Sequence, residues 1–302
     1  MINSDTKQKC GMIAVIGAPN AGKSTLVNQI VGTKVSIVSP KVQTTRTSVM
    51  GITVIDDAQL IFIDTPGIFS PKKRLERAMV AAAWNETEDV DAIVMVVDAL
   101  KIREKETSSI LAKLKQQKLK AILVINKIDA LPKEKLFQIA ERFNNEEVFT
   151  DIFMVSALKG DGIQDLVNKI VSVVPESIWL FPEDQITNMP SRLLAAEITR
   201  EKIFLQVHKE LPYAINVSTE LWHENSDGSV KIEQTIFVES VSHKKIVLGN
   251  KGSKIKTIGM ASRKELEAIF ETKIHLFLFV KVREKWSDDR SIYQEWGLDF
   301  NA

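Results

Sequence analysis

The feature that most constrains this chain is a short loop that begins at one glycine and ends in Gly-Lys-Ser. Residues 17–24 read Gly-Ala-Pro-Asn-Ala-Gly-Lys-Ser and match the pattern G-x-x-x-x-G-K-[ST]. An apolar run, residues 12–16, precedes the loop, and a helix-like segment, residues 23–31, follows it. A strand, a glycine-rich loop and a helix in this order point backbone N–H groups and a positive helix end at phosphate oxygens. We therefore predict a phosphate-binding loop, with a chance match in a structural loop as the alternative.

The residue types in this loop each suggest a role. The ammonium of Lys23 is expected to reach the β- and γ-phosphates of a nucleotide, and the Ser24 hydroxyl is expected to ligate Mg²⁺. The predicted nucleotide contacts of this segment are Gly17, Asn20, Ala21, Gly22, Lys23, Ser24 and Thr25.

A second motif, Asp64-Thr65-Pro66-Gly67, directly follows the apolar run 60–63. An aspartate at the end of a strand beside a phosphate-binding loop can hold Mg²⁺ through water, and the Gly67 N–H is expected to meet the γ-phosphate. Asp-x-Pro-Gly is also a favourable turn, which is the alternative interpretation. The order of the two motifs favours the catalytic one.

A third motif, Asn126-Lys127-Ile128-Asp129, follows the apolar run 121–125. A carboxylate such as that of Asp129 can accept two parallel hydrogen bonds from the N1–H and exocyclic amine of guanine, which adenine does not offer. Asn126 and Lys127 are expected to brace the loop and the ring. Ser156-Ala157-Leu158 ends the next strand and is expected to direct a backbone N–H at guanine O6, although it also suits an ordinary turn. Four signals in this order predict an enzyme that hydrolyses GTP to GDP.

The spacing of the apolar runs predicts the fold of the first half. Short apolar runs alternate with longer amphipathic segments, which is typical of a doubly wound α/β domain with a mostly parallel sheet. The predicted strands lie at residues 12–16, 60–63, 92–97, 121–125 and 152–155. This pattern stops near Pro175. We predict a GTP-binding domain over residues 1–176 and a linker over residues 177–191.

The second predicted domain, residues 192–302, has a different order of elements. A helix is expected first, followed by two strands joined by a turn at residues 225–228, two helices and a last strand. The expected ranges are 192–206, 213–222, 231–239, 244–248, 253–270 and 273–282. The apolar run 276–280 is expected to be a core strand. The order α-β-β-α-α-β predicts an α+β domain with a C-terminal tail.

A basic segment in this domain predicts an RNA-binding surface. Between Val241 and Lys264 there are seven Lys or Arg and no acidic residue. They surround Gly249-Asn250-Lys251-Gly252, a G-x-x-G loop whose glycines let a nucleic acid backbone come close, because no Cβ intrudes. A solvated basic face with a glycine helix cap is the alternative. The predicted RNA contacts are Lys244, Lys245, Gly249, Asn250, Lys251, Gly252, Lys254 and Lys256. Such a loop binds single strands, so we expect RNA and not DNA.

These motifs together resemble the Era family of bacterial GTPases over nearly the whole chain. Three further stretches carry the resemblance: Gln43-Thr44-Thr45-Arg46, residues 181–187 and residues 246–256. The resemblance implies a GTP-dependent factor in maturation of the 30S ribosomal subunit. Its second domain would be a type II KH domain that binds near the 3′ end of 16S rRNA.

The resemblance also implies individual roles. Thr44 or Thr45, with Thr45 preferred, would be the switch I ligand of Mg²⁺ and the γ-phosphate, which gives Ser24, Thr45 and Asp64 as the metal site. The catalytic set would then be Lys23, Thr45, Asp64 and Gly67. The chain departs from the family at Asn188, where an aspartate is usual. Any interdomain contact that needs this charge is therefore in doubt.

The position after Gly67 predicts slow hydrolysis. It holds Ile68, whereas Ras-type proteins place there the glutamine that orients the attacking water. The loop asparagine Asn20 together with this missing glutamine suggests K⁺ as a further cofactor. Two rival functions stay open at this point: an RNA-binding assembly factor whose nucleotide is mainly structural, and a tRNA-modification-type GTPase.

The composition limits which metal sites, disulfides and cellular locations are expected. The single cysteine, Cys10, excludes disulfides and cysteine zinc sites within the chain, and the four histidines lack metal-ligand spacing. The polar start of the chain and the absence of a run of about 18 apolar residues favour a cytoplasmic protein. Peripheral association with the inner membrane is left open, and a monomer is expected. For Trp286 and Trp296, local packing and RNA contact are both left open.

Overall fold

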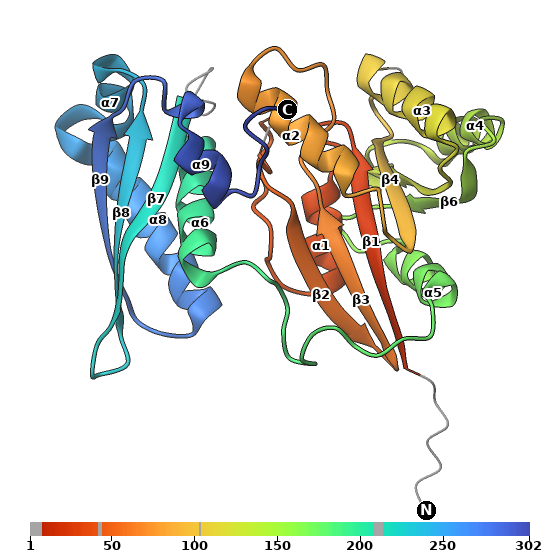
Figure 1. Cartoon of the computed structure of the whole chain (residues 1–302), viewed down its shortest axis with the longest axis horizontal. Helices are drawn as coiled ribbons and strands as arrows, with labels where there is room; N and C mark the ends of the chain where they lie inside the picture. The colour runs from red at the N-terminus through yellow and green to blue at the C-terminus, as the bar shows by residue number, and fades with distance from the viewer. Residues whose placement is uncertain (1–7, 42–43, 103, 208–213) are drawn as a thin grey trace, which may run out of the picture. The chain divides into compact units, whose positions relative to one another are not determined.

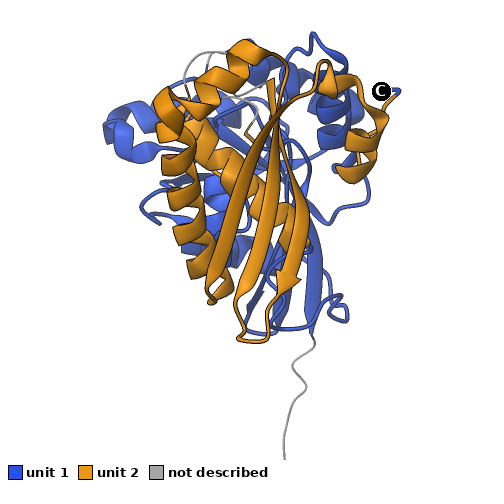
Figure 2. Cartoon of the chain, turned by 90° about the vertical axis from the view of Figure 1, so that its left-hand side faces the viewer, with its two compact units in different colours: residues 1–36, 45–188, 301–302 blue, residues 37–44, 189–300 orange. Residues whose placement is uncertain are grey.

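The computed structural model of the protein describes residues 8–41, 44–102, 104–207 and 214–302. Gln43, which carries part of the resemblance, lies outside these ranges, as do the polar start over residues 1–7 and the beginning of the strand expected at 213–222. The chain forms two compact units (Figure 2). The first comprises residues 1–36, 45–188 and 301–302, and the second comprises residues 37–44 and 189–300.

The first unit contains a six-stranded sheet in the order β2-β3-β1-β4-β5-β6 (Figure 1). All neighbouring strands are parallel except β2, which pairs antiparallel with β3. The strands are β1 Lys9–Gly17, β2 Val49–Ile55, β3 Ala58–Asp64, β4 Ala92–Asp98, β5 Ala121–Asn126 and β6 Phe149–Val155. The doubly wound, mostly parallel fold predicted from the sequence is confirmed, and β2 is the strand that the apolar runs did not indicate.

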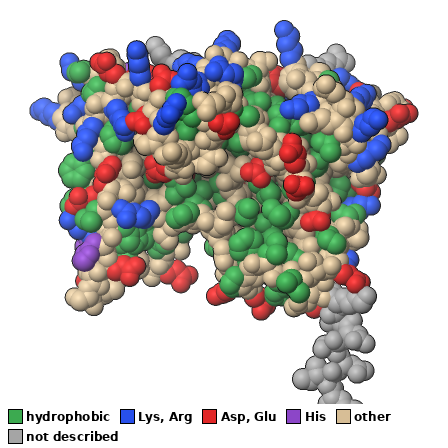
Figure 3. Space-filling model, in the orientation of Figure 1, with side chains coloured by type: hydrophobic (Ala, Val, Ile, Leu, Met, Phe, Trp, Pro, Cys, Tyr) green, Lys and Arg blue, Asp and Glu red, His purple; other side chains and the backbone are tan. Residues whose placement is uncertain are grey.

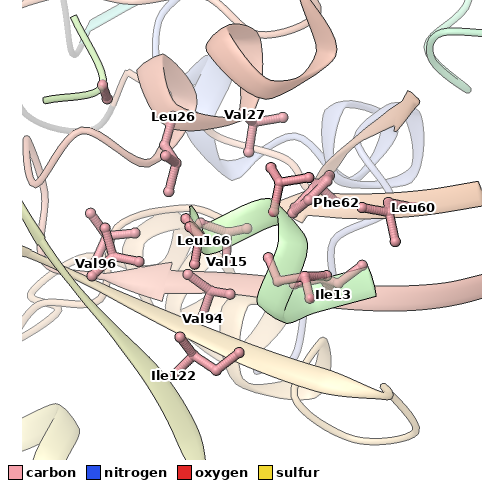
Figure 4. Close-up of a cluster of buried hydrophobic side chains, with 14 of the residues drawn as sticks. Ile13, Val15, Leu26, Val27, Leu60, Phe62, Val94, Val96, Ile122 and Leu166 are labelled. Carbon is pink, nitrogen blue, oxygen red and sulfur yellow. The ribbon is translucent and has the colours of Figure 1, made fainter. Parts of the chain in front are cut away.

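Helices cover both faces of this sheet. Two hydrophobic clusters show this: one takes its helical residues from α1 and α5, and the other takes them from α2, α3 and α4. The helices are α1 Lys23–Val31, α2 Arg74–Asn85, α3 Lys105–Gln117, α4 Lys133–Asn144 and α5 Ile163–Val173. In the first cluster, Leu26 of α1 and Leu166 of α5 lie against Val15, Val94 and Val96 of the central strands (Figure 4). Both faces of the sheet are therefore buried, so a ligand can reach the sheet only at the ends of its strands.

The second unit contains a three-stranded sheet in the order β7-β8-β9, antiparallel between β7 and β8 and parallel between β8 and β9. Its elements are α6 Ser191–Gln206, β7 Ile215–Glu224, β8 Val230–Val238, α7 Val241–Leu248, α8 Ser253–Phe270, β9 Ile274–Val282 and α9 Arg290–Glu295. Ile203 of α6 and Ile258 of α8 share a buried cluster with Ile215, Ile236 and Val280 of the strands. The predicted α-β-β-α-α-β order is confirmed, with α9 added in the tail.

Two expectations about apolar residues in this unit are settled by the structure. Trp286 and Trp296 are buried and pack edge to face, 6.1 Å apart, and the Trp286 indole N–H donates to the Ala214 carbonyl over 3.0 Å. Local packing is therefore their role. The prediction of a core strand over residues 276–280 was wrong for alternate residues, because Phe277 and Phe279 are 47% and 49% exposed. β9 turns only one face to the helices.

The chain that leaves the first unit runs along the edge strand β2. The Ile52 N–H donates to the Ile186 carbonyl over 2.8 Å, and Gly51 forms a bridge with Thr187. The Met50 N–H donates to the Asn188 side-chain oxygen over 3.3 Å. The side-chain oxygen of an asparagine accepts this hydrogen bond as an aspartate oxygen would. This contact within the first unit therefore does not need the negative charge that is usual at position 188.

A short segment from early in the chain completes the second unit. Ile37 is buried in a cluster with Leu194 and Ile198 of α6 and Ile232 of β8. The Val38 N–H donates to the Glu201 carboxylate over 2.7 Å. Residues 37 and 38 thus pack against α6 within the second unit, an arrangement that a division of the chain at residue 176 does not contain.

A candidate GTP site and a candidate RNA groove

The phosphate-binding loop joins β1 to α1 in a conformation that requires its glycines. Gly22 precedes α1 with φ at 99°, and a Cβ there would lie 2.1 Å from the Asn126 side-chain nitrogen. A Cβ on Gly17 would lie 2.3 Å from the Val96 carbonyl oxygen. Side chains are excluded at both positions, which keeps the backbone N–H groups available to phosphate.

Lys23 is buried inside the curve of this loop. Its ammonium donates to the carbonyls of Gly17 and Ala18, each over 3.1 Å. Burial lowers the pKa of the Lys23 ammonium to about 8, and the nearby charge of Asp64 opposes this shift. A buried cation with only carbonyl partners is suited to an anionic ligand such as a phosphate.

Three oxygen-bearing side chains meet next to Lys23. The Ser24 hydroxyl donates to an Asp64 carboxylate oxygen over 2.6 Å and lies 2.9 Å from the Thr45 hydroxyl. The second Asp64 carboxylate oxygen is buried and has no hydrogen-bond partner among the described residues. Burial raises the pKa of the Asp64 carboxyl, and the Ser24 hydrogen bond and the Lys23 charge oppose this shift. An all-oxygen set with one unmatched buried carboxylate oxygen fits Mg²⁺.

The segment after Asp64 passes very close to the phosphate-binding loop. A Cβ on Gly67 would lie 2.9 Å from three atoms of Pro19, and the Ile68 N–H donates to the Gly17 carbonyl over 3.0 Å. Ile68 itself is only 4% exposed and packs in the hydrophobic cluster beneath α2 and α3. It offers no group to orient water, in agreement with the sequence expectation.

Asn126 ties the base-binding segments together. Its side-chain nitrogen donates to the Ala21 carbonyl over 2.9 Å, and its side-chain oxygen accepts the Lys127 and Ala157 N–H groups. The Lys127 ammonium donates to the Asn20 carbonyl over 2.8 Å and pairs with Asp98 at 2.6 Å. These contacts brace the loop, and the predicted contact of Asn126 and Lys127 with the ring stays a prediction.

Asp129 lies in a short 3₁₀ turn that follows β5. The Ser156 hydroxyl donates to one Asp129 carboxylate oxygen over 2.8 Å, and the Lys159 ammonium is 4.0 Å from the other. The Leu158 side chain is 77% exposed beside this carboxylate-bearing loop. The structure thus brings the phosphate-binding residues and the predicted guanine selector to the same edge of one sheet.

The G-x-x-G loop of the second unit joins α7 to α8. Gly249 ends α7 with φ at 73°, and Gly252 precedes α8 with φ at 77°. A Cβ on Gly249 would lie 2.9 Å from the Lys254 backbone nitrogen. Among the described residues, no carboxylate lies within ion-pair distance of the lysines around this loop. The loop is therefore a positively charged turn whose backbone is accessible.

A groove of about 430 Å³ begins just beyond this loop. Its walls are the first half of α8 and the helix-facing side of β9. The lining residues are Ile255, Lys256, Gly259, Met260, Arg263, Leu276 and Leu278. Apolar walls with cations at the rim suit nucleotide bases and their phosphates. Leu276 and Leu278 were not among the predicted contacts, since an apolar run carries no sign of which face meets a ligand.

Two family models match the chain. The model described as a 50S ribosome-binding GTPase matches residues 12–127, and the KH domain model matches residues 210–287. The first covers the phosphate-binding loop and the Asp64 motif, and the second covers the G-x-x-G loop and the groove.

Curated relatives agree with these models. GTPase Era of Brucella suis biovar 1 (strain 1330) is 52% identical over 295 residues, which is 98% of this chain and 95% of the relative. GTPase Era of Afipia carboxidovorans is 53% identical over 292 residues, which is 97% of this chain and 95% of the relative.

Solved structures agree as well. The crystal structure of Era in complex with MgGDPNP and nucleotides 1506–1542 of 16S ribosomal RNA is similar with a TM-score of 0.91 and 40% identity. That of a variant of Aquifex aeolicus Era bound to GDP·AlF₄⁻ has a TM-score of 0.90 and 39% identity, and both cover 96% of this chain and 99% of the other. With its motifs, two units and full-length relatives in agreement, this chain belongs to the Era family of GTPases.

Proposed function

We propose that this chain is a GTP-dependent switch that binds the 3′ region of 16S rRNA in its α8–β9 groove and assists maturation of the 30S subunit. The observation that carries the proposal is the apolar groove beside the charged G-x-x-G loop, in a chain that also has the sequence motifs of a GTP site. The similar Era structure solved with 16S rRNA nucleotides supports the choice of RNA. A tRNA-modification function is disfavoured, because the family match extends through the second unit.

The hydrolytic chemistry follows from the residues of the first unit. In this proposal the Lys23 ammonium, which is buried in the loop beside the Gly17 carbonyl, neutralises the β- and γ-phosphates, and the Gly67 N–H binds the γ-phosphate. The Ser24 and Thr45 hydroxyls, with Asp64 acting through water, would hold Mg²⁺, which neutralises phosphate charge when it is bound. With a buried Ile68 in place of a water-orienting group, basal turnover is expected at roughly 10⁻⁴ to 10⁻² s⁻¹. The intact metal-ligand set favours an enzyme over a factor whose nucleotide is only structural.

The setting proposed for this switch is the cytoplasm. No helix in the described part of the chain is both long and apolar enough to cross a membrane. Peripheral association with the inner membrane and a monomeric state are parts of the proposal that sedimentation with vesicles and analytical ultracentrifugation would test.

The test of RNA binding uses a matched pair of variants in the loop. Gly252→Asp adds a side chain and a negative charge at the closest approach of the phosphates, whereas Gly252→Asn adds nearly the same bulk without charge and tolerates the positive φ at this position. Fluorescence anisotropy with a labelled oligonucleotide from the 16S rRNA 3′ region measures affinity over a salt series. Native protein should bind more tightly with a non-hydrolysable GTP analogue than with GDP.

We expect Gly252→Asp to lose at least about tenfold in RNA affinity and Gly252→Asn to lose less, while both keep native GTP turnover. Lys23→Ala should show the reverse, with hydrolysis lost and the groove intact. If Gly252→Asp binds RNA as tightly as the native protein, the assignment of this loop is wrong.

A further inference from the structure

Two aromatic side chains on β9 are exposed on the face opposite the groove. Leu276 and Leu278 line the groove, and the alternating Phe277 and Phe279 point the other way. Figure 3, in which β9 lies at the left margin, shows hydrophobic side chains among Lys, Arg and acidic residues on that side of the molecule. Pairs of half-exposed phenylalanines on a regular strand are unfavourable in water unless something binds them.

The tail is linked to this outer face near Phe237. Arg283, just after β9, lies 5.5 Å from the Phe237 ring and pairs with Asp289 of the tail. Phe237 is half-buried, whereas Phe277 and Phe279 are exposed. The exposed aromatic surface is thus a defined patch and not a general property of the sheet.

Cations border the two rings. The Lys231 ammonium of β8 lies 5.5 Å from the Phe277 ring centroid, and Lys281 follows on the same face of β9. The one carboxylate among the facing residues of these strands is Glu233, which pairs with Lys231 at 2.6 Å. An incoming phosphate would compete with Glu233 for Lys231.

The patch is continuous with the groove across the free edge of the sheet. β9 is the last strand in the order β7-β8-β9, so its second edge is unpaired within the described sheet (Figure 1). A single strand leaving the groove at Leu276 needs only to cross this edge to reach Phe277. Side chains two residues apart on a strand are separated by about 7 Å, which leaves room for one base on each ring.

We propose that Phe277 and Phe279 form a second binding site for single-stranded RNA, which stacks two bases beyond those held in the groove while Lys231 and Lys281 contact their phosphates. The proposal rests on the proposed function of the groove. It extends the contact from the roughly four nucleotides of one KH groove to a longer single strand. The occupant is RNA because exposed rings flanked by lysines are what base stacking and phosphate contact require.

The test compares short and long oligonucleotides. A four-nucleotide RNA that fills the groove is compared by anisotropy with RNAs extended by four nucleotides on the 5′ or the 3′ side. For native protein, one of the two extensions should raise affinity by about tenfold or more. The double change Phe277→Ala and Phe279→Ala should abolish this gain and leave four-nucleotide binding unchanged. The double change to Trp, which keeps two stacking rings, should preserve it.

Two further variants probe the charges, and a third serves as a control. Glu233→Gln should strengthen binding of the longer RNA, because it removes the carboxylate that competes with phosphate. Lys231→Ala should flatten its salt dependence by about 0.7 in the log–log slope. Phe137→Ala, which removes a 68% exposed ring from α4 of the first unit, should change nothing.

The outcomes separate this proposal from the function on which it rests. If the four-nucleotide RNA binds and Gly252→Asp abolishes that binding, but neither extension adds affinity, the second site is refuted and the groove stands. If no RNA binds the native protein, the proposed function fails as well. If the alanine pair instead converts a dimer to a monomer in sedimentation and leaves the affinity gain intact, the patch is a self-association surface and the proposal is overturned.

Discussion

Asp129 contacts Ser156 through a single hydroxyl, and the nearest ammonium, that of Lys159, is 4.0 Å away. Its second carboxylate oxygen can therefore turn towards a base. Asp129→Asn would exchange one acceptor for a donor, which suits the carbonyl of xanthine in place of the amine of guanine. We expect the variant to prefer xanthosine nucleotides, measured by competition of GTP, XTP and ATP against a fluorescent nucleotide.

Ser156→Ala is the control for this change, since it removes the hydroxyl contact and keeps the carboxylate. It should weaken GTP binding without changing the order of preference. An unaltered preference for GTP in Asp129→Asn would contradict the role given to this residue.

Asn20 occupies the left-handed region with φ at 62°, and its carbonyl accepts the Lys127 ammonium. Its side chain is the loop feature that predicts a K⁺ ion. Asn20→Gly removes that side chain and keeps the backbone conformation, which Asn20→Ala would strain by about 1 kcal/mol. We expect native GTP turnover to rise when Na⁺ is replaced by K⁺ at constant ionic strength, and Asn20→Gly to lose the difference. Equal native rates in both salts would exclude the K⁺ site.

At the scale of elements, the sequence predicted those helices and strands whose residue pattern is set by neighbours along the chain. Helix α8 runs over Ser253–Phe270, the predicted range, because Gly252 marks its start and its periodicity is regular. Strand β2 escaped prediction because Gly51 interrupts its apolar run. That glycine has a packing reason: a Cβ there would lie 2.7 Å from Val27 of α1. Only the tertiary structure reveals this close approach.

The same limit applies to the groove and the outer face of β9. Five consecutive apolar residues indicate a buried strand, but the pattern cannot assign alternate side chains to different surroundings. The sequence could propose motifs for phosphate and guanine binding, because that chemistry requires fixed residue types at fixed spacings. It could not propose Leu276 and Leu278, since many apolar residues would serve at these positions.

The tail gives a prediction at this scale. Trp286 is 1% exposed, packs on Trp296 and caps the Ala214 carbonyl. Trp286→Ala would leave a cavity and an unsatisfied carbonyl, and should cost about 3–5 kcal/mol in the free energy of unfolding of the second unit. Urea denaturation followed by the remaining tryptophans measures this. Wild-type stability in the variant would show that the tail is not part of the packed unit.

At the scale of the whole molecule, one of the places where the chain passes from one unit to the other lies between Thr44 and Thr45. Within the second unit, the buried Arg200 guanidinium donates to the Thr44 carbonyl and pairs with Glu197. Within the first unit, the Thr45 hydroxyl lies beside Ser24 and Asp64. One peptide bond therefore separates a residue held by α6 from a predicted ligand of Mg²⁺.

We expect Arg200→Gln to reduce the nucleotide dependence of RNA binding. The ratio of RNA affinities with a GTP analogue and with GDP should fall towards one, because Thr44 is no longer held. Arg192→Gln on the same helix, whose native side chain contacts β7 carbonyls instead, is the matched control and should keep the native ratio. A native ratio in Arg200→Gln would show that this arginine only supports the fold.

Ile37 packs among Leu194, Ile198 and Ile232, and this packing limits how the second unit can be separated from the rest of the chain. A fragment that starts at residue 189 would carry every element of the KH domain and still lack a piece of its own interior. If the second unit were transplanted as a contiguous block, the apolar side chains that Ile37 covers would therefore be exposed to water. No single contiguous segment of the gene encodes the folded second unit, so evolution could exchange this unit intact only together with residues 37–44.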